Sequence, residues 1–327
     1  MSGPSKHGVK SADADSIASS LREHRVDVAC GELAFVDLTF AGLDGHPGPG
    51  EERRSQDLLR SAGGSAIIAV GARRLGLSSA VVSPIGDDAD GDFLRGELAS
   101  ENVVWAGRRV ARTAVTAVLP ADGERAMATF DPGEQVTAAE LAAVEPRAVV
   151  ISLPRLDLVP PGAIVYATAG DAEARADVET PFDLSGVRAL IVNEREALLM
   201  TGEADADGAA LALSRRAPCA IVTVGPRGAV AATEDDLVHV PAITVEAVDT
   251  TGAGDLFTAA YVWADRLGAP LEERMRWAAL YAALSVRVPT ALASAASRAM
   301  LADAGAMHGL RMPAAAPPYA AMKSDAR

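Results

Sequence analysis

The chain reads Val248-Asp249-Thr250-Thr251-Gly252-Ala253-Gly254-Asp255 and continues directly into the apolar run Leu256 to Trp263. Because β-branched residues precede this stretch, we expect a strand, a glycine turn and then a buried helix. Free backbone N–H groups and the helix dipole make the start of such a helix an anion site. Asp255 places a carboxylate at the same position. An acid beside an anion hole is typical of a base that deprotonates a hydroxyl while the hole holds the phosphoryl group under attack.

The same stretch also admits a purely structural interpretation. The helix dipole alone favours Asp in a first helical turn, and Gly-Ala-Gly also suits a tight turn. For a single Gly-x-Gly-Asp this interpretation would prevail. Here Asp249 and Asp255 bracket Thr-Thr-Gly-Ala-Gly after an expected strand, and this arrangement favours a functional site.

Composition narrows the class of partner. The 327 residues include 30 Lys plus Arg and 44 Asp plus Glu, and the net charge of −14 argues against nucleic acid or an anionic membrane as the main partner. No apolar run is long enough to span a membrane. Cys30 and Cys219 are isolated, so we expect neither a disulfide framework nor a zinc site, and a reducing cytoplasm fits. We expect flexible tails at residues 1–24 and 311–327, and the first lacks the apolar core of a signal peptide.

Between these tails, residues 25–310 alternate between short apolar runs and helical patterns. Strands are expected at residues 26–31, 148–152, 163–167, 189–192 and 220–224, and helices at 137–144, 194–200 and 208–216. Gly63-Gly64 is expected to open a further helix. The alternation predicts an α/β fold with a doubly wound, mostly parallel sheet flanked by helices, whose ligands bind at the carboxyl ends of the strands.

Two segments depart from this alternation. Residues 108–130 have the pattern of short strands around a turn at 121–123, and residues 32–45 include a strand with Asp37 amid apolar neighbours. A parallel sheet has no place for such a hairpin, so we expect a small separate sheet acting as a lid over a cleft. The carboxylate of Asp37 then faces either solvent or that cleft. Another hairpin is expected at residues 228–240.

Five motifs follow one another along the chain. They are Gly63-Gly64 before a helix that ends at Gly76, Ile85-Gly86-x-Asp88-x-x-Gly91, Asn193-x-x-Glu196, Thr223-x-Gly225-x-Arg227-Gly228, and Asp249 to Asp255. The chain has no GxxxxGK[ST] phosphate loop and no GxGxxG after its first strand, so a nucleotide would be bound without either. In this order the five motifs resemble those of the ribokinase-like (PfkB) carbohydrate kinase family over about residues 26–304.

The resemblance implies an ATP-dependent kinase that phosphorylates a primary alcohol of a sugar or sugar-like substrate. Asp255 would be the general base, and the N–H groups of Gly252, Ala253 and Gly254 would form the anion hole. Asp37 and Asp249 would accept hydrogen bonds from sugar hydroxyls, with the backbone of Gly63 and Gly64 alongside. The small sheet would exclude water from the reaction, and family habit suggests a homodimer through it.

The resemblance also implies where ATP and Mg²⁺ bind. The nucleotide would lie along Thr223, Gly225 and Gly228, with Arg227 as a candidate cation. Asn193 and Glu196 would order Mg²⁺ and the phosphates through water. An Asn followed by Glu three residues later is also an ordinary helix capping box, and that alternative stays open. The segment after Arg287 lacks the Gly usual in the family, so a monovalent-cation (K⁺) site also stays open.

The identity of the acceptor stays open as well. Ile68 stands where the family usually has an Asn that bonds the substrate, and we expect Ile68 to line the acceptor pocket. A nucleoside kinase of the same fold is therefore an alternative to a sugar kinase. A catalytically weak regulator that binds a sugar or a nucleotide is a third hypothesis. Retention of Asp255 with the full glycine turn argues against it, because a pure binder has little need of a buried base.

Overall fold

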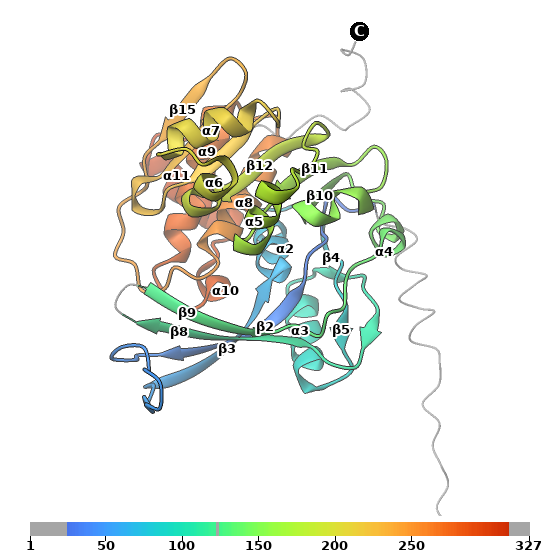
Figure 1. Ribbon diagram of the computed structural model, residues 1–327, viewed down its shortest axis with the longest axis vertical. Helices are drawn as coiled ribbons and strands as arrows, with labels where there is room; N and C mark the ends of the chain where they lie inside the picture. Colours follow the sequence, from blue (N-terminus) through green and yellow to red (C-terminus); the bar gives the residue numbers. More distant parts are fainter. Residues whose placement is uncertain (1–24, 122–123, 314–327) are drawn as a thin grey trace, which may run out of the picture.

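A large twisted sheet forms the centre of the molecule (Figure 1). The computed structural model describes residues 25–121 and 124–313, and within them this sheet has the strand order β15-β14-β13-β12-β11-β10-β1-β4-β6. All neighbours in this order from β13 to β6 pair in parallel, whereas β14 pairs antiparallel with both β13 and β15, so β14 alone runs against the other strands. The predicted doubly wound, mostly parallel sheet is confirmed. Its strands are β1 (Val28–Cys30), β4 (Ser79–Val81), β6 (Val104–Trp105), β10 (Ala148–Ser152), β11 (Ile164–Thr168), β12 (Val187–Asn193), β13 (Ala220–Thr223), β14 (Ala229–Ala232) and β15 (Leu237–Val240).

Both faces of this sheet are buried, and this explains why its strands are continuously apolar. Along β12, Ala189 and Ile191 enter one hydrophobic cluster, whereas Leu190 and Val192 enter another on the opposite face. Successive strand residues point to opposite faces, so each face needs its own cover of helices.

Helices supply that cover. On one face α2 (Ser65–Arg74), α8 (Ala253–Arg266) and α9 (Leu271–Ser285) pack together, and on the other lie α5 (Asp171–Glu179), α6 (Glu194–Thr201) and α7 (Ala206–Ser214) (Figure 1). No helix among the described residues has the length and apolar character needed to cross a membrane. The remaining helices are α3 (Ala89–Ser100), α4 (Ala138–Ala143), α10 (Ala291–Ser294), α11 (Arg298–Met307) and the short 3₁₀ turns η1 (Leu153–Leu158) and η2 (Gly225–Arg227).

A separate four-stranded sheet, here called the small sheet, lies beside this α/β body (Figure 1). Its order is β3-β2-β8-β9, with bounds β2 (Ala34–Ala41), β3 (Asp57–Gly64), β8 (Ala114–Ala121) and β9 (Glu124–Phe130). Two further strands, β5 (Ile85–Gly86) and β7 (Arg109–Val110), pair with each other. Residues 122–123 of the predicted turn, the predicted tail 1–24, and residues 314–327 of the other tail lie outside the described residues.

Helix α2 begins where Gly63 and Gly64 predicted it, at Ser65 with Gly64 as the N-cap residue, but strand β3 was not predicted. The two glycines end β3 and pair with Phe35 and Ala34 of β2. Most of β3 is exposed or half-buried, so it lacks the apolar alternation that reveals a strand in a sequence.

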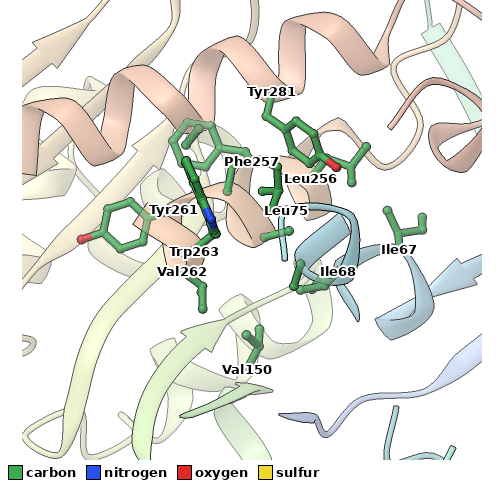
Figure 2. Packing of buried hydrophobic residues seen from close by; sticks show 14 of the residues in the cluster. Ile67, Ile68, Leu75, Val150, Leu256, Phe257, Tyr261, Val262, Trp263 and Tyr281 are labelled. Carbon is green, nitrogen blue, oxygen red and sulfur yellow. The ribbon is translucent and has the colours of Figure 1, made fainter. Parts of the chain in front are cut away.

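The packing between α8 and α9 anchors the helix that carries Asp255. The rings of Trp263 and Trp277 meet edge to face, with centroids 5.8 Å apart and an interplanar angle of 90°. Figure 2 shows the neighbouring apolar side chains of α8, including Leu256, Phe257 and Val262, directed into the same core. Such aromatic pairs add stabilisation beyond the burial of their area.

We expect Trp277→Ala to lower the free energy of unfolding by about 3–5 kcal/mol, because it leaves a large cavity between α8 and α9. Urea denaturation followed by circular dichroism measures this loss. Met307→Ala, at a side chain that is 79% exposed, is the control and should change stability by less than about 0.5 kcal/mol. A loss below about 1 kcal/mol for Trp277→Ala would contradict the assigned packing.

Candidate active site

A glycine in the left-handed region sets the start of helix α8. Gly252 is the N-cap residue with φ +73°, and a Cβ atom there would lie 2.5 Å from the Cβ of Ala291 and 2.9 Å from Cδ1 of Ile67. Any side chain at this position would therefore meet strain and a clash. The turn thus lies tightly between α2 and α10, and it directs the first turn of α8, which contains Asp255.

The backbone of this turn offers unpaired hydrogen-bond donors. The described backbone provides no partner for the N–H groups of Gly252 and Gly254, whereas Ala253 N–H donates to Thr250 O at 3.3 Å. The hydroxyl oxygen of Thr251 is buried, and the described residues supply it with no partner either. The first N–H groups of a helix have no partner within the helix, and together with the buried Thr251 hydroxyl these donors form a potential binding site for an anion or a polar ligand.

Asp249 holds the same turn in place. Its carboxylate accepts hydrogen bonds from Thr251 N at 2.8 Å and from Thr290 N at 3.0 Å. These bonds tie the segment before the turn to the segment that leads into α10. The strand expected immediately before the turn is not formed, because residues 241–252 are irregular and the last strand, β15, ends at Val240. Each carboxylate oxygen retains a further lone pair.

Asp37 approaches from the small sheet. It lies on β2 in register with Ser61 of β3 and Thr116 of β8, and only 4% of the residue is exposed. A Cβ atom at Gly63 would lie 2.5 Å from Oδ2 of Asp37, so the carboxylate rests against the Gly63 backbone. The described residues include no hydrogen-bond or ion-pair partner for the carboxylate of Asp37. A buried acid without a partner is costly, and such groups mark functional sites.

Asp37 and Asp255 influence each other electrostatically, although Asp37 lies on β2 of the small sheet and Asp255 in helix α8. Burial, and then the charge of Asp37, raise the pKa of Asp255 to about 7, while the charge of Arg125 opposes the rise. Burial, and then the charge of Asp249, raise the pKa of Asp37 to about 7. The described part of the chain also supplies no hydrogen-bond or ion-pair partner for Asp255. Near neutral pH both groups therefore exchange protons readily.

The ends of β12 and β13 bring the predicted metal and nucleotide residues together. Asn193 and Thr223 are register partners at the carboxyl ends of these adjacent strands. Asn193 caps α6 by accepting from Glu196 N at 2.9 Å, and Glu196 accepts in return from Asn193 N at 2.8 Å. The capping box is thus present. Burial raises the pKa of Glu196 to about 7, so a cation close by would favour its charged form.

The loop after β13 requires glycine at both of its turns. Gly225 has φ +56° and Gly228 has φ +104°, and a Cβ atom at Gly228 would lie 2.0 Å from Val240 O. Arg227 forms an ion pair with Glu194 at the start of α6. The predicted cation of this loop is therefore already matched by an acid in this structure.

The structure corrects the predicted position of Ile68 and adds Arg125, a residue that the sequence did not single out. Ile68 is 5% exposed and belongs to the same hydrophobic core cluster as Val150 and Val262 (Figure 2), so its side chain packs in the core instead of lining a pocket. Arg125 of β9 was missed, although its Nη1 donates to Thr250 Oγ1 at 3.0 Å. An exposed Arg beside a hairpin turn carries no signal in the sequence that distinguishes it from other surface cations.

The fold is that of a doubly wound α/β protein with a small accessory sheet. The chain belongs to the PfkB family, since the family model for pfkB family carbohydrate kinases matches residues 27–298. It is 47% identical over 66 residues to deoxyribokinase of Salmonella typhi, but it spans only 22% of that protein's length, and the match covers 20% of this chain. It is 28% identical over 271 residues to ribokinase of Mus musculus, which covers 74% of this chain and 83% of the ribokinase.

Solved structures have the same architecture. Ribokinase of Thermotoga maritima superposes with a TM-score of 0.70 at 21% identity, covering 85% of this chain and 99% of that chain. Adenosine kinase of Sinorhizobium meliloti superposes with a TM-score of 0.68 at 23% identity, covering 83% and 98%. At these identities the likeness shows the shared fold, and that fold accommodates both a sugar kinase and a nucleoside kinase.

The raised pKa of Asp255 predicts a pH-dependent stability. The folded protein retains a proton that the unfolded chain releases near pH 4, so the free energy of unfolding falls as the pH rises from about 4 to about 7. Asp255→Asn removes this loss. We therefore expect the free energy of unfolding of the variant, compared with that of the wild type, to be about 1–2 kcal/mol higher at pH 8 than at pH 5. This estimate allows for partial exposure of the carboxylate.

Chemical denaturation at both pH values measures the gain. Asp303→Asn, at an exposed acid of α11, is the matched control and should show the same stability difference at pH 5 and pH 8. A pH-independent difference for Asp255→Asn would contradict the raised pKa.

Proposed function

We propose that this protein is an ATP-dependent phosphotransferase that phosphorylates a hydroxymethyl group of a sugar or sugar-like substrate. One observation carries the proposal. Asp37 of the small sheet and Asp255 of helix α8 are carboxylates that lack partners among the described residues, and they interact electrostatically beside a turn with unpaired N–H groups. Membership of the PfkB family agrees with this chemistry.

Asp255 acts as the general base in this proposal. A carboxylate is a much weaker base than an alkoxide, so it takes the hydroxyl proton late, as the new phosphorus–oxygen bond forms. A pKa near 7 makes Asp255 a stronger base than an ordinary Asp, while a substantial fraction of the molecules carries the ionised form at neutral pH. The N–H groups of Gly252 and Gly254 stabilise the charge on the phosphoryl oxygens, and Ala253 N–H joins them once its 3.3 Å bond to Thr250 O opens.

The acceptor lies against the small sheet. Asp37 accepts hydrogen bonds from its hydroxyls, and the backbone of Gly63 and Gly64 lies alongside. Asp249 orients the catalytic turn and uses its remaining lone pairs toward the acceptor. Ser61 and Thr116 flank Asp37 in the sheet, and this hydroxyl-rich surface supports a polyol over a flat nucleobase. A nucleoside acceptor is the alternative.

The nucleotide lies along Thr223, Gly225 and Gly228, with Arg227 and its partner Glu194 at the edge. Asn193 and Glu196 would hold, through water, the Mg²⁺ that accompanies ATP, and that ion would supply positive charge to the phosphates. The raised pKa of Glu196 fits this assignment, because a nearby cation would restore the charged form. A K⁺ site is left open.

The proposal also includes a homodimeric assembly and a cytoplasmic location. The small sheet exposes Leu58, Met127 and Phe130, which supports a homodimer through this sheet. Both cysteines are free and buried, in keeping with a reducing cytoplasm.

We expect Asp255→Asn to reduce kcat at least about 1,000-fold, because an amide cannot accept the proton, while ATP binding persists. A screen of sugars and nucleosides that follows ADP release gives the rate, and calorimetry with ATP gives the affinity. Asp303→Asn is the control. Turnover of the true acceptor near the wild-type rate by Asp255→Asn would exclude the assignment. No turnover of any acceptor by the wild type would favour the regulator hypothesis.

We expect Asp37→Asn to raise KM for the acceptor about 10- to 100-fold with a smaller change in kcat, because charged hydrogen bonds to bound hydroxyls are weakened. Steady-state kinetics at saturating ATP measure both constants. Asp44→Asn, at an acid on the same side of the molecule whose side chain is 84% exposed, should leave both constants within about twofold. Equal KM values for Asp37→Asn and wild type would place the acceptor elsewhere.

A further inference from the structure

Arg125 of β9 reaches the catalytic turn from the small sheet. Its Nη1 donates to Thr250 Oγ1 at 3.0 Å, and the two residues are 125 positions apart in the chain. Thr250 precedes Gly252, the N-cap of α8, by two residues. The guanidinium therefore lies at the rim of the turn that offers the unpaired N–H groups.

The strand register independently directs Arg125 toward the same side as Asp37. Asp37 pairs with Thr116, and Arg125 pairs with Pro120 on the same strand. Thr116 and Pro120 are four residues apart, so all four residues lie on one face of the small sheet. Arg125 lies about 13 Å further along the strands than Asp37, which leaves room for an acceptor between the two.

Arg125 is also left without an acid partner in an acidic site. Arg108, Arg155 and Arg216 each form ion pairs with carboxylates, but among the described residues no carboxylate pairs with Arg125. The charge of Arg125 nevertheless acts on Asp255 and opposes the rise of its pKa. The bond to Thr250 uses one of the five N–H donors of the guanidinium, so the others are available to an anion.

An incoming nucleotide meets an unfavourable charge balance here. The carboxylates of Asp37, Asp249 and Asp255 are close enough for their charges to interact, and a terminal phosphate adds more negative charge. In the proposed function, Glu196 would hold a Mg²⁺ ion that would neutralise part of this charge. The acceptor side needs a second cation, and a guanidinium matches the oxygens of a phosphoryl group in geometry and charge.

We propose that Arg125 is a further catalytic residue, which contacts the transferring phosphoryl group of ATP from the small sheet. This inference rests on the proposed phosphotransferase function. As the bond between the terminal phosphorus and ADP breaks, the acceptor oxygen forms the new phosphorus–oxygen bond and its proton passes to Asp255. Arg125 stays protonated throughout and stabilises the charge on the phosphoryl oxygens. Thr250 holds the guanidinium when no phosphoryl group is bound.

Three variants test this role. Arg125→Ala removes the cation, Arg125→Lys keeps the charge without the fork of donors, and Thr250→Val removes only the neutral partner. Arg112→Ala is the charge-matched control, because Arg112 is another exposed cation close to the small sheet and packs over Phe130, 4.9 Å from its ring centroid. Circular dichroism and urea denaturation of each variant establish that it is folded.

We expect Arg125→Ala to lower kcat about 100- to 1,000-fold, Arg125→Lys about 10-fold, Thr250→Val less than Arg125→Lys, and Arg112→Ala less than twofold. Added guanidinium ion should restore part of the activity of Arg125→Ala. A kcat of Arg125→Ala within threefold of wild type would overturn the proposal. A loss in Thr250→Val equal to that in Arg125→Ala would also overturn it, because the contact would then only hold the turn.

Nucleotide affinity gives a readout that does not need turnover. Calorimetry with Mg²⁺-ATP and Mg²⁺-ADP should show that Arg125→Ala weakens ATP at least 10-fold and ADP less than threefold, because only ATP carries the transferring group. Equal losses for ATP and ADP would overturn the proposal. If the wild type phosphorylates no acceptor, the proposed function fails, whereas a selective loss of ATP affinity in Arg125→Ala still supports the phosphoryl contact.

Discussion

The candidate site depends on the close packing around Gly252, which leaves no space for a side chain there. The left-handed turn lies between Ile67 of α2 and Ala291 of α10, so three separated segments fix where α8 begins. The position of that helix end determines where the unpaired N–H groups point and where Asp255 stands. A side chain at residue 252 would displace both groups together, since the anion site and the acid belong to one turn.

Burying the unpaired acids of this site is unfavourable for the free energy of folding, and the packing of the α/β body offsets that cost. Asp37 and Asp255 are raised to a pKa of about 7 because they are buried near other acids without partners. Elsewhere the chain matches its buried acids carefully, as in the double contact of Asp177 with Arg216. Leaving polar groups unpaired at one place and pairing them elsewhere is typical of a binding or catalytic site.

The small sheet supplies charged side chains to the candidate site in addition to covering it. Its residues Asp37 and Arg125 lie on one face, one acidic and one basic, and each is electrostatically linked to the turn of the large body. In the proposed reaction the first binds the acceptor and the second binds the phosphoryl group. The position of this sheet relative to α8 would then control binding and chemistry together.

Local patterns were enough to predict the parallel sheet, the turn before α8 and the family, because glycine requirements and strand alternation are properties of neighbouring residues. They also placed Asp37 on a strand. Only the tertiary structure decided that β3 exists, that Ile68 packs in the core and that Arg125 touches Thr250. Each of these depends on contacts between distant segments. The identity of a residue records whether a side chain is polar or apolar, but the three-dimensional packing decides what that side chain faces.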